Sequence, residues 1–475
     1  MTQHYGLFIN GKWIETQENN EVLNKYYGDL FATVSKASEK EVDDAISSAE
    51  VAYKETSFSP YERYKVLHRV SDLLQARKEE LAGIITNEAG KPIKQARAEI
   101  DRATQTFEIA AEEAKRIHGE GVPVQAAPGS ENRMAFTIKV PVGVVGAISP
   151  FNFPVNLVAH KIAPAIAAGN TVVLKPASVT PISSLKLAEL FEEAGLPEGF
   201  LNVVIGSGST VGNQMMEDER IHYYTFTGSA EVGEKLKQNT GLNKLTLELG
   251  NNSPVIVDKD ADVELAAQTL AQKSFAYAGQ VCISVQRIYI HEDVREQFQS
   301  AFISATEELQ VGDPFDPDTD VGPMIGEKEA ERAEEWLQEA KGQGAEVIHG
   351  GNRKGSVLEP TIVSNVDHAM KVVCEEVFAP IVTMMSFTDL DACIKEVNKS
   401  DYGLQGGIFT SDVNRAFYAA QKVEVGGFMI NDASQYRVDL MPYGGVKNSG
   451  WGKEGPKYAI EDMTEERLVV MNLQG

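Results

Sequence analysis

Cysteine is scarce in this sequence, with three cysteines in 475 residues. Cys282, Cys374 and Cys393 form no C-x-x-C pair and are too scattered for a disulfide framework, which favours a reducing cytoplasm. No group of histidines and cysteines has metal-ligand spacing, so we expect no metal site. The chain also lacks an uncharged apolar run of about 18 residues, so no membrane span is expected.

Positive charge is also in short supply. The sequence holds 44 lysines and arginines against 69 aspartates and glutamates, which gives a formal net charge of −25. Because nucleic acids and anionic membranes repel such a surface, we expect neither as a partner. Residues 1–7 contain no basic segment leading into a long apolar one, so no signal peptide is expected. An anionic substrate would need locally placed cations.

The sequence does have a repeated alternation of short apolar runs with helical segments, and it is too long for one core. Such alternation predicts doubly wound parallel sheets, with ligands at the carboxyl ends of the strands. A second α/β unit is expected to begin at about Pro254. The predicted strands are 144–148, 171–174, 201–205, 223–226 and 245–249 in the first unit, and 286–290, 345–348, 381–385 and 407–410 in the second.

Local signals predict several element boundaries. Asn10-Gly11 predicts a hairpin turn, and Ser38 with Glu41 has the pattern of a capping box at the start of a helix. A long helical stretch is expected over about residues 61–89. Thr180-Pro181 is expected to start another helix, with threonine as the N-cap and proline in the first turn.

The segment 122–141 changes in character. Residues 134–140 alternate like an edge strand, and residues 467–471 resemble a last strand that can pair with it. Such an arm either protrudes to pair with another subunit or forms an ordinary surface hairpin.

A carboxylate and a thiol stand out as a candidate catalytic pair. Glu248 closes the apolar run 245–249 and is followed by Gly250, and Cys282 lies further along the chain. A thiolate can attack a carbonyl, and a carboxylate can activate the water that releases the acyl group. Taken alone, the pair fits an inert buried cysteine and a solvated glutamate better than a catalytic pair, because that is how lone cysteines and glutamates more often occur.

Two glycine-containing turns are candidate phosphate sites. Gly206-Ser207-Gly208 with Gly212 has the spacing G-x-G-x-x-x-G, a weak form of the dinucleotide fingerprint. Gly228-Ser229 follows a strand and opens a helix, so its backbone N–H groups can face a pyrophosphate. Gly228 also fits a simple tight turn.

Seven motifs in one order give the sequence a family resemblance. The chain resembles the aldehyde dehydrogenase superfamily over nearly its whole length, and most closely the branch of lactaldehyde and non-phosphorylating glyceraldehyde-3-phosphate dehydrogenases. The resemblance implies an α/β fold of two doubly wound parallel-sheet domains with a β-arm for oligomerisation. It implies a dinucleotide-binding domain at 1–121 and 142–253, a catalytic domain at 254–455 and an arm at 122–141 and 456–475. The motifs are Pro150-Phe151-Asn152-Phe153-Pro154, Val173-Leu174-Lys175-Pro176, Phe226-Thr227-Gly228-Ser229, Leu247-Glu248-Leu249-Gly250, Gly279-Gln280-Val281-Cys282, Glu375-Glu376-Val377-Phe378 and Pro442-Tyr443-Gly444-Gly445.

The resemblance implies oxidation of an aldehyde to a carboxylic acid with a nicotinamide cofactor. Cys282 would form a thiohemiacetal, and Asn152 with the backbone N–H of Cys282 would stabilise its oxyanion. Glu248 would activate the water that hydrolyses the resulting thioester. Relatives that release the acyl group to coenzyme A lack this carboxylate, so hydrolytic release is expected. A homodimer or homotetramer is also implied.

The resemblance further implies a set of cofactor contacts. Lys175 would reach the adenosine ribose, and Glu376 the nicotinamide ribose. NAD-preferring members often carry glutamate at the position of Ser178, where a carboxylate repels a 2′-phosphate. We therefore expect NADP or NAD as cofactor, with NADP accepted and a candidate for preference. The expected contacts are Ile148, Ser149, Pro150, Phe151, Lys175, Ser178, Gly208, Gly212, Phe226, Gly228, Ser229, Val232, Leu249, Gly250, Glu376 and Phe378.

Substrate contacts are expected from Arg102, Phe153, His160 and Arg437, which suit a small polar aldehyde such as lactaldehyde. Each arginine also fits a structural ion pair, and the histidine also fits a satisfied helix residue. Val281 precedes the nucleophile, where semialdehyde and phosphoglyceraldehyde enzymes often carry arginine. Dehydrogenases of glyceraldehyde-3-phosphate or succinic semialdehyde remain alternatives, as do a cofactor-independent thioesterase and a non-catalytic protein of the same fold.

Overall fold

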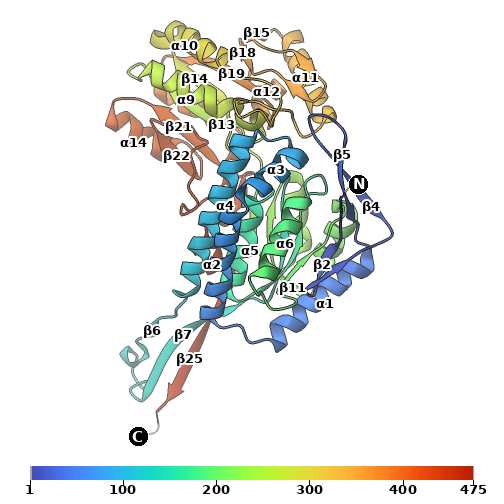
Figure 1. The fold of residues 1–475 in the computed structure, drawn as a ribbon. Coiled ribbons are helices and arrows are strands. Elements are labelled where there is room, and N and C mark those ends of the chain that lie inside the picture. The colour runs from blue at the N-terminus through green and yellow to red at the C-terminus, as the bar shows by residue number, and fades with distance from the viewer. Residues whose placement is uncertain (1–2, 474–475) are drawn as a thin grey trace.

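The computed structural model describes residues 3–473, so residues 1, 2, 474 and 475 of the predicted units lie outside it. Two large sheets lie one above the other in Figure 1, and a narrow β-arm projects from the lower end. This is the expected α/β fold. Among the described residues, no helix is both long and apolar enough to cross a membrane.

The first sheet has eight strands in the order β24-β12-β11-β8-β9-β10-β2-β3. Its five central strands run parallel, whereas the strands at both edges pair antiparallel. The central strands are buried along their length because helices cover both faces, which explains their near-continuous apolar sequences. The strands are β24 (Gly450–Trp451), β12 (Lys244–Glu248), β11 (Ile221–Thr227), β8 (Val144–Ile148), β9 (Thr171–Lys175), β10 (Leu201–Val203), β2 (Leu7–Ile9) and β3 (Lys12–Ile14).

The second sheet has seven strands in the order β15-β18-β19-β14-β13-β21-β22, and all but β15 pair in parallel. It carries its own apolar cores, separate from that of the first sheet. The strands are β15 (Glu346–His349), β18 (Thr361–Ser364), β19 (Ile381–Phe387), β14 (Val285–His291), β13 (Ser253–Val257), β21 (Gln405–Phe409) and β22 (Gly427–Ile430).

Helices fill the space around both sheets. In the first unit, α1 packs against β9 and β10, and α2 and α4 pack against α5, which lies on the sheet. The helices of this unit are α1 (Glu39–Glu55), α2 (Pro60–Ala76), α3 (Lys78–Ala89), α4 (Ile93–Ala114), α5 (Asn156–Ala168), α6 (Ile182–Glu193), α7 (Asn213–Glu217) and α8 (Ala230–Asn239). Those that follow are α9 (Val263–Phe275), α10 (Arg295–Glu307), α11 (Glu327–Gly342), α12 (Lys371–Cys374), α13 (Leu390–Val397), α14 (Val413–Lys422) and α15 (Pro456–Asp462).

The remaining strands form small sheets. One has the order β1-β5-β4 and packs at the N-terminal end, and two are two-stranded. Their members are β1 (Gln3–Tyr5), β5 (Leu30–Ser35), β4 (Asn19–Leu23), β16 (Arg353–Lys354), β17 (Val357–Leu358), β20 (Tyr402–Gly403) and β23 (Val446–Lys447).

The arm joins distant parts of the chain. Strand β7 (Arg133–Pro141) pairs antiparallel with β25 (Thr464–Asn472), with Met134 opposite Met471, so the predicted pairing of these segments is confirmed. The prediction that residues 134–140 form an edge strand is wrong, because β6 (Gly121–Val122) pairs on the other side of β7. The edges of this sheet are therefore β25 and β6.

Three local predictions are confirmed. Asn10-Gly11 forms the turn between β2 and β3, and Ser38 with Glu41 forms a capping box on α1. The stretch 61–89 is helical as expected, and it is divided into α2 and α3 at Arg77, which leaves helical geometry with φ −105° and ψ 22°.

The predicted N-cap at Thr180 is wrong. Helix α6 begins at Ile182, and the hydroxyl of Thr180 has no hydrogen-bond partner among the described residues. The side chain of Glu88, distant in sequence, accepts from the backbone N–H groups of Ile182 and Ser183 at 2.8 and 2.9 Å. A carboxylate from α3 thus replaces the local cap, which local sequence rules do not anticipate.

Candidate active site

Cys282 lies between the two sheets, in the segment that leads from α9 into β14. Tyr277, Ala278 and Gly279 just before it all have positive φ, at 49°, 50° and 70°. A side chain at Gly279 would place its Cβ 2.1 Å from the carbonyl oxygen of Ala379, so only glycine fits there. This sharp left-handed turn ends α9 and aims the cysteine back toward the first sheet.

Two cavities meet at Cys282. One, of about 570 Å³, lies along the carboxyl ends of the strands of the first sheet, and the other, of about 520 Å³, opens beside α4 and α9. Cys282 and Leu157 line both cavities. A thiol placed there can reach ligands held on either side.

Cys282 is partly buried, and its thiol lies in an unfavourable setting for a charge. Burial, together with the nearby carboxylates of Glu248 and Glu376, raises its pKa to about 11. The hydroxyl of Tyr443, 3.0 Å from Sγ, and the positive charge of Arg437 act in the opposite direction.

Glu248 ends β12 and has almost no contact with solvent. Neither carboxylate oxygen has a hydrogen-bond partner among the described residues. Burial and the charge of Glu454 hold the pKa of Glu248 well above its usual range, so this carboxyl group favours its protonated form. The charge of Glu248 raises the pKa of Cys282, but Glu248 lines neither cavity.

Asn152 lies in the loop after β8 and lines the larger cavity with Cys282. Its Nδ2 donates to the carbonyl oxygen of Gln280 at 3.0 Å, and its Oδ1 has no hydrogen-bond partner among the described residues. The structure thus brings Asn152 and Cys282 to the same cavity, with the amide nitrogen directed at the loop that carries the thiol.

The larger cavity contains every predicted cofactor residue except Ser178. The Ser178 hydroxyl donates to the carbonyl oxygen of Gly206 at 2.7 Å, and its neighbour Ala177 lines the cavity instead. Lys175 is buried, and the one hydrogen bond that its amino group makes with the described residues goes to the carbonyl oxygen of Pro176, at 3.3 Å. Burial lowers the pKa of Lys175 to about 8.

Further groups shape this cavity. Ser229 caps α8, and Val232 N–H donates to its hydroxyl. Glu376 accepts a hydrogen bond from Asn251 N–H at 3.0 Å, and burial raises its pKa to about 7. The rings of Phe151 and Phe378 meet edge to face, 5.9 Å apart. Six residues that line this cavity were not predicted from the sequence: Leu157, Ala177, Met216, Thr227, Leu236 and Arg332.

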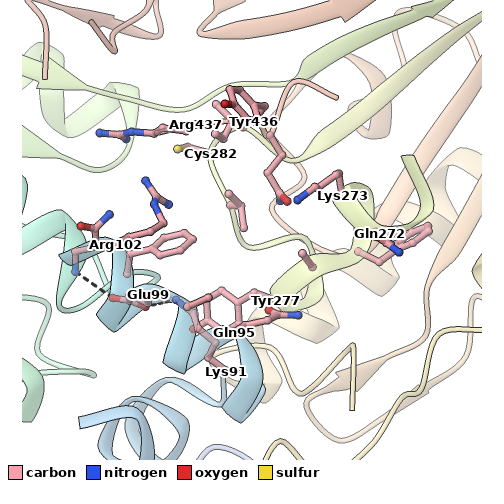
Figure 2. A pocket seen from close by; sticks show the side chains of 18 of the residues that line it. Lys91, Gln95, Glu99, Arg102, Gln272, Lys273, Tyr277, Cys282, Tyr436 and Arg437 are labelled. Atoms are coloured by element: carbon pink, nitrogen blue, oxygen red, sulfur yellow. Dashed lines mark hydrogen bonds and ion pairs between the residues drawn. The ribbon is translucent and has the colours of Figure 1, made fainter. Parts of the chain in front are cut away.

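The four predicted substrate residues separate in the structure. Arg102, Phe153 and Arg437 line the smaller cavity, whereas His160 is buried and does not line it. Figure 2 shows Arg102 and Arg437 in this cavity. Arg102 forms a two-point ion pair with Asp439, at 2.8 and 3.2 Å. His160 Nε2 also contacts Asp439, at 2.7 Å, whereas His160 Nδ1 is buried without a hydrogen-bond partner among the described residues.

Arg437 connects the smaller cavity to a buried polar network. One of its terminal nitrogens lies 3.2 Å from Glu454, which also pairs with Lys161 at 3.1 Å. Lys161 donates to Thr227 at 2.6 Å. The charges of Glu454, Arg437 and Lys161 in this network all act on the pKa of Glu248.

Sequence reasoning missed much of the wall of the smaller cavity. Figure 2 shows side chains from α4, from the Cys282 segment and from the chain near Tyr436 converging there. These segments are far apart in sequence, and no local pattern marks their shared position. The missed residues include Lys91, Gln95, Glu99, Gln272, Lys273, Tyr277, Gln435, Tyr436 and Tyr443.

Comparison with known proteins matches the chain to one family. The model of the aldehyde dehydrogenase family matches residues 13–469. A 3-sulfolactaldehyde dehydrogenase of Priestia aryabhattai is 58% identical over 471 residues, covering 99% of this chain and 98% of that protein. A lactaldehyde dehydrogenase of Methanococcus vannielii is 41% identical, covering 98% of this chain and all of that protein.

A solved structure agrees with these sequence relatives. The NADP-dependent glyceraldehyde-3-phosphate dehydrogenase of Bacillus halodurans, complexed with NADP, superposes with a TM-score of 0.96 at 37% identity. The match covers 99% of this chain and all of that one. The predicted resemblance to the lactaldehyde and glyceraldehyde-3-phosphate branch is thus confirmed, and the chain belongs to the aldehyde dehydrogenase family.

Proposed function

We propose that this enzyme oxidises a short hydroxyaldehyde with an anionic tail to its carboxylic acid, using NADP or NAD. The observation that carries the proposal is the place of Cys282, where a dinucleotide-sized cavity and a smaller polar cavity meet. A nucleophile at that junction can hold an aldehyde from one side while a hydride acceptor approaches from the other.

The chain's own groups suit each covalent step. The Cys282 sulfur attacks the aldehyde carbon, and Asn152 Nδ2 donates to the oxygen on which negative charge develops. The bound nicotinamide supplies the acceptor for the hydride that leaves this carbon. Glu248 then takes a proton from water, which attacks the Cys282 thioester and frees the acid and the thiol. The raised pKa of Glu248 makes its carboxylate form a stronger base for the proton of that water.

The larger cavity fits a nicotinamide dinucleotide on three grounds. The Lys175 amino group is buried without a carboxylate partner and so can donate to a ribose or a phosphate. The N-terminus of α8 opens at Gly228-Ser229, on the cavity wall. A Cβ at Gly208 would meet nothing within 4 Å, which leaves room for a ligand against this turn.

We further propose that NADP is accepted. Ser178 offers no carboxylate to repel a 2′-phosphate, and its hydroxyl is occupied by Gly206. The solved structure from Bacillus halodurans, which is NADP-dependent and holds NADP, supports this assignment.

The substrate proposal rests on donors that lack acceptors. In the part of the chain that the structure describes, Gln435 Nε2 and Arg437 Nε are buried without a hydrogen-bond partner, and both residues line the smaller cavity. The amino group of Lys273 lines the same cavity and makes no ion pair among the described residues. Three such donors suit a sulfonate or similar oxyanion, and the 58% identical relative is a 3-sulfolactaldehyde dehydrogenase.

The experiment is a comparison of initial rates of cofactor reduction for 3-sulfolactaldehyde, lactaldehyde, glyceraldehyde-3-phosphate, succinic semialdehyde and benzaldehyde, each with NADP⁺ and NAD⁺. We expect the highest kcat/KM for 3-sulfolactaldehyde. A preference for uncharged lactaldehyde would overturn the anionic tail but keep the hydroxyaldehyde. Full activity in Cys282→Ala would overturn the mechanism.

The arm supports an oligomer. Leu468, Val470 and Met471 are large apolar side chains exposed on β25, an edge strand of the arm sheet, and Met134 is exposed on the neighbouring central strand β7. We propose that this edge pairs with another subunit in a homodimer or homotetramer.

We also propose that the unit built on the first sheet binds the dinucleotide and that the unit built on the second sheet carries Cys282.

A further inference from the structure

Tyr443 contacts the nucleophile directly. Its hydroxyl oxygen lies 3.0 Å from Cys282 Sγ, and this is the only hydrogen bond that the sulfur makes with the described residues. Tyr443 belongs to the motif Pro442-Tyr443-Gly444-Gly445, for which the sequence predicts no role. None of the steps proposed above requires its hydroxyl group.

The position of Tyr443 is fixed from several sides. The side chain is buried, and its backbone exchanges two hydrogen bonds with Glu454, at 3.1 and 2.6 Å. The guanidinium of Arg437 lies over its ring, 3.6 Å from the centroid. Arg437 is itself anchored by Glu454. The hydroxyl therefore has little freedom to turn away from the sulfur.

We propose that Tyr443 is a catalytic residue that donates a hydrogen bond to Cys282 and, with the Arg437 charge behind its ring, stabilises the thiolate. A thiolate has no proton to donate, so the hydroxyl must be the donor once the thiol ionises. The thiol proton passes to solvent, and the tyrosine keeps its own. Burial holds the pKa of Tyr443 well above its usual range, so it stays protonated.

The surroundings of the sulfur explain why such a donor is needed. Burial, Glu248 and Glu376 all disfavour the thiolate, and only Tyr443 and Arg437 favour it among the groups that act on it most. A hydrogen bond to a charged group is stronger than one between neutral groups, so the contact gains strength as the thiol ionises.

The test is the rate of Cys282 alkylation by iodoacetamide as a function of pH. It uses the full chain without cofactor, in a Cys374→Ser background because Cys374 is exposed. Tyr443→Phe should keep the ring on Arg437 yet slow alkylation below the thiol pKa by about tenfold and shift the profile to higher pH. Tyr53→Phe is the matched control, because the Tyr53 hydroxyl donates to Pro141 and lines neither cavity.

Further readouts separate this role from a structural one. The Kd of NADP⁺ and the melting temperature of Tyr443→Phe should match those of the parent, while kcat falls. An unchanged alkylation profile in a folded Tyr443→Phe protein would overturn the proposal. Should that variant not fold, Arg437→Gln serves instead: it should also raise the pH at which Cys282 reacts, and an unchanged profile would count against the proposal.

Because alkylation needs no aldehyde, its outcome does not depend on the substrate. A wrong substrate assignment would show only in the panel of aldehydes, whereas a wrong role for Tyr443 would show only in the thiol titration.

Discussion

Lys161 and Glu454 form an ion pair with a nitrogen–oxygen distance of 3.1 Å and almost no solvent exposure on either side. The pair lies beneath Glu248, and its two members act on that residue with opposite sign. The Glu454 charge raises the pKa of Glu248, and the Lys161 charge lowers it. The proton affinity of the proposed base is therefore set by the network and by burial together.

Glu454→Gln should move the acid limb of the kcat–pH profile to lower pH. Removing the Glu454 charge lowers the pKa of Glu248, so the carboxylate form, which acts as base, persists to lower pH. The measurement is kcat across pH with a saturating aldehyde. Glu50→Gln, on exposed α1, is the control. An acid limb that stays at the same pH would show that Glu248 is not the base in the rate-limiting step.

The same substitution should destabilise the fold. It leaves Lys161 buried without its carboxylate partner, and breaking a buried pair from one side costs about 3–5 kcal/mol. Chemical denaturation of Glu454→Gln and of Glu50→Gln measures the difference. Equal stability in both variants would contradict a stabilising contribution from the Lys161–Glu454 pair.

Ser178→Glu should reduce the preference for NADP⁺ over NAD⁺, measured as the ratio of kcat/KM values, by about tenfold or more, because a carboxylate repels the 2′-phosphate. Val179→Glu adds the same charge one residue later at an exposed position and should leave the ratio near its original value. An equal effect from both variants would point to general charge rather than to the ribose site.

Lys273→Ala should raise KM for an anionic hydroxyaldehyde by about tenfold while changing KM for lactaldehyde little, since only the anion uses the charge. Figure 2 places Lys273 on the cavity wall near Tyr436. Lys371→Ala removes a lysine that pairs with Glu339 away from both cavities and is the control. A similar loss with both aldehydes would contradict an anion contact.

Glu88 should make stability fall as pH rises. Burial raises its folded-state pKa from 4.5 to about 7 even though it accepts two backbone N–H bonds. The folded state therefore binds this proton more tightly than the unfolded state, and its contribution is lost as pH rises through about 7. Its loss is on the order of 3 kcal/mol. Glu88→Gln should flatten this slope in denaturation between about pH 5 and about pH 8, whereas Glu80→Gln, on the exposed side of α3, should not.

The sequence predicted the parts of the fold that depend on local pattern. Continuous apolar runs marked the buried parallel strands, because both faces of such strands are covered. Asn10-Gly11 and the Ser38–Glu41 box marked a turn and a helix start, because these features act through neighbouring residues. The error at Thr180 arose because Glu88, distant in sequence, binds the first backbone N–H groups of α6. The break between α2 and α3 at Arg77 was not predicted.

The candidate site divides in the same way. By themselves, the residues of the sequence determined the chemistry on offer: a thiol at Cys282, a carboxylate at Glu248, turns for a dinucleotide, and the absence of a carboxylate at Ser178. Only the tertiary structure decided which groups act on one another. It buried His160 outside the smaller cavity, and it placed Lys273 on the wall of that cavity with no ion pair among the described residues. It also brought Tyr443, 161 positions away, to the sulfur of Cys282. The physical reason is that burial and charge–charge contact depend on distance in space, which one sequence does not encode locally.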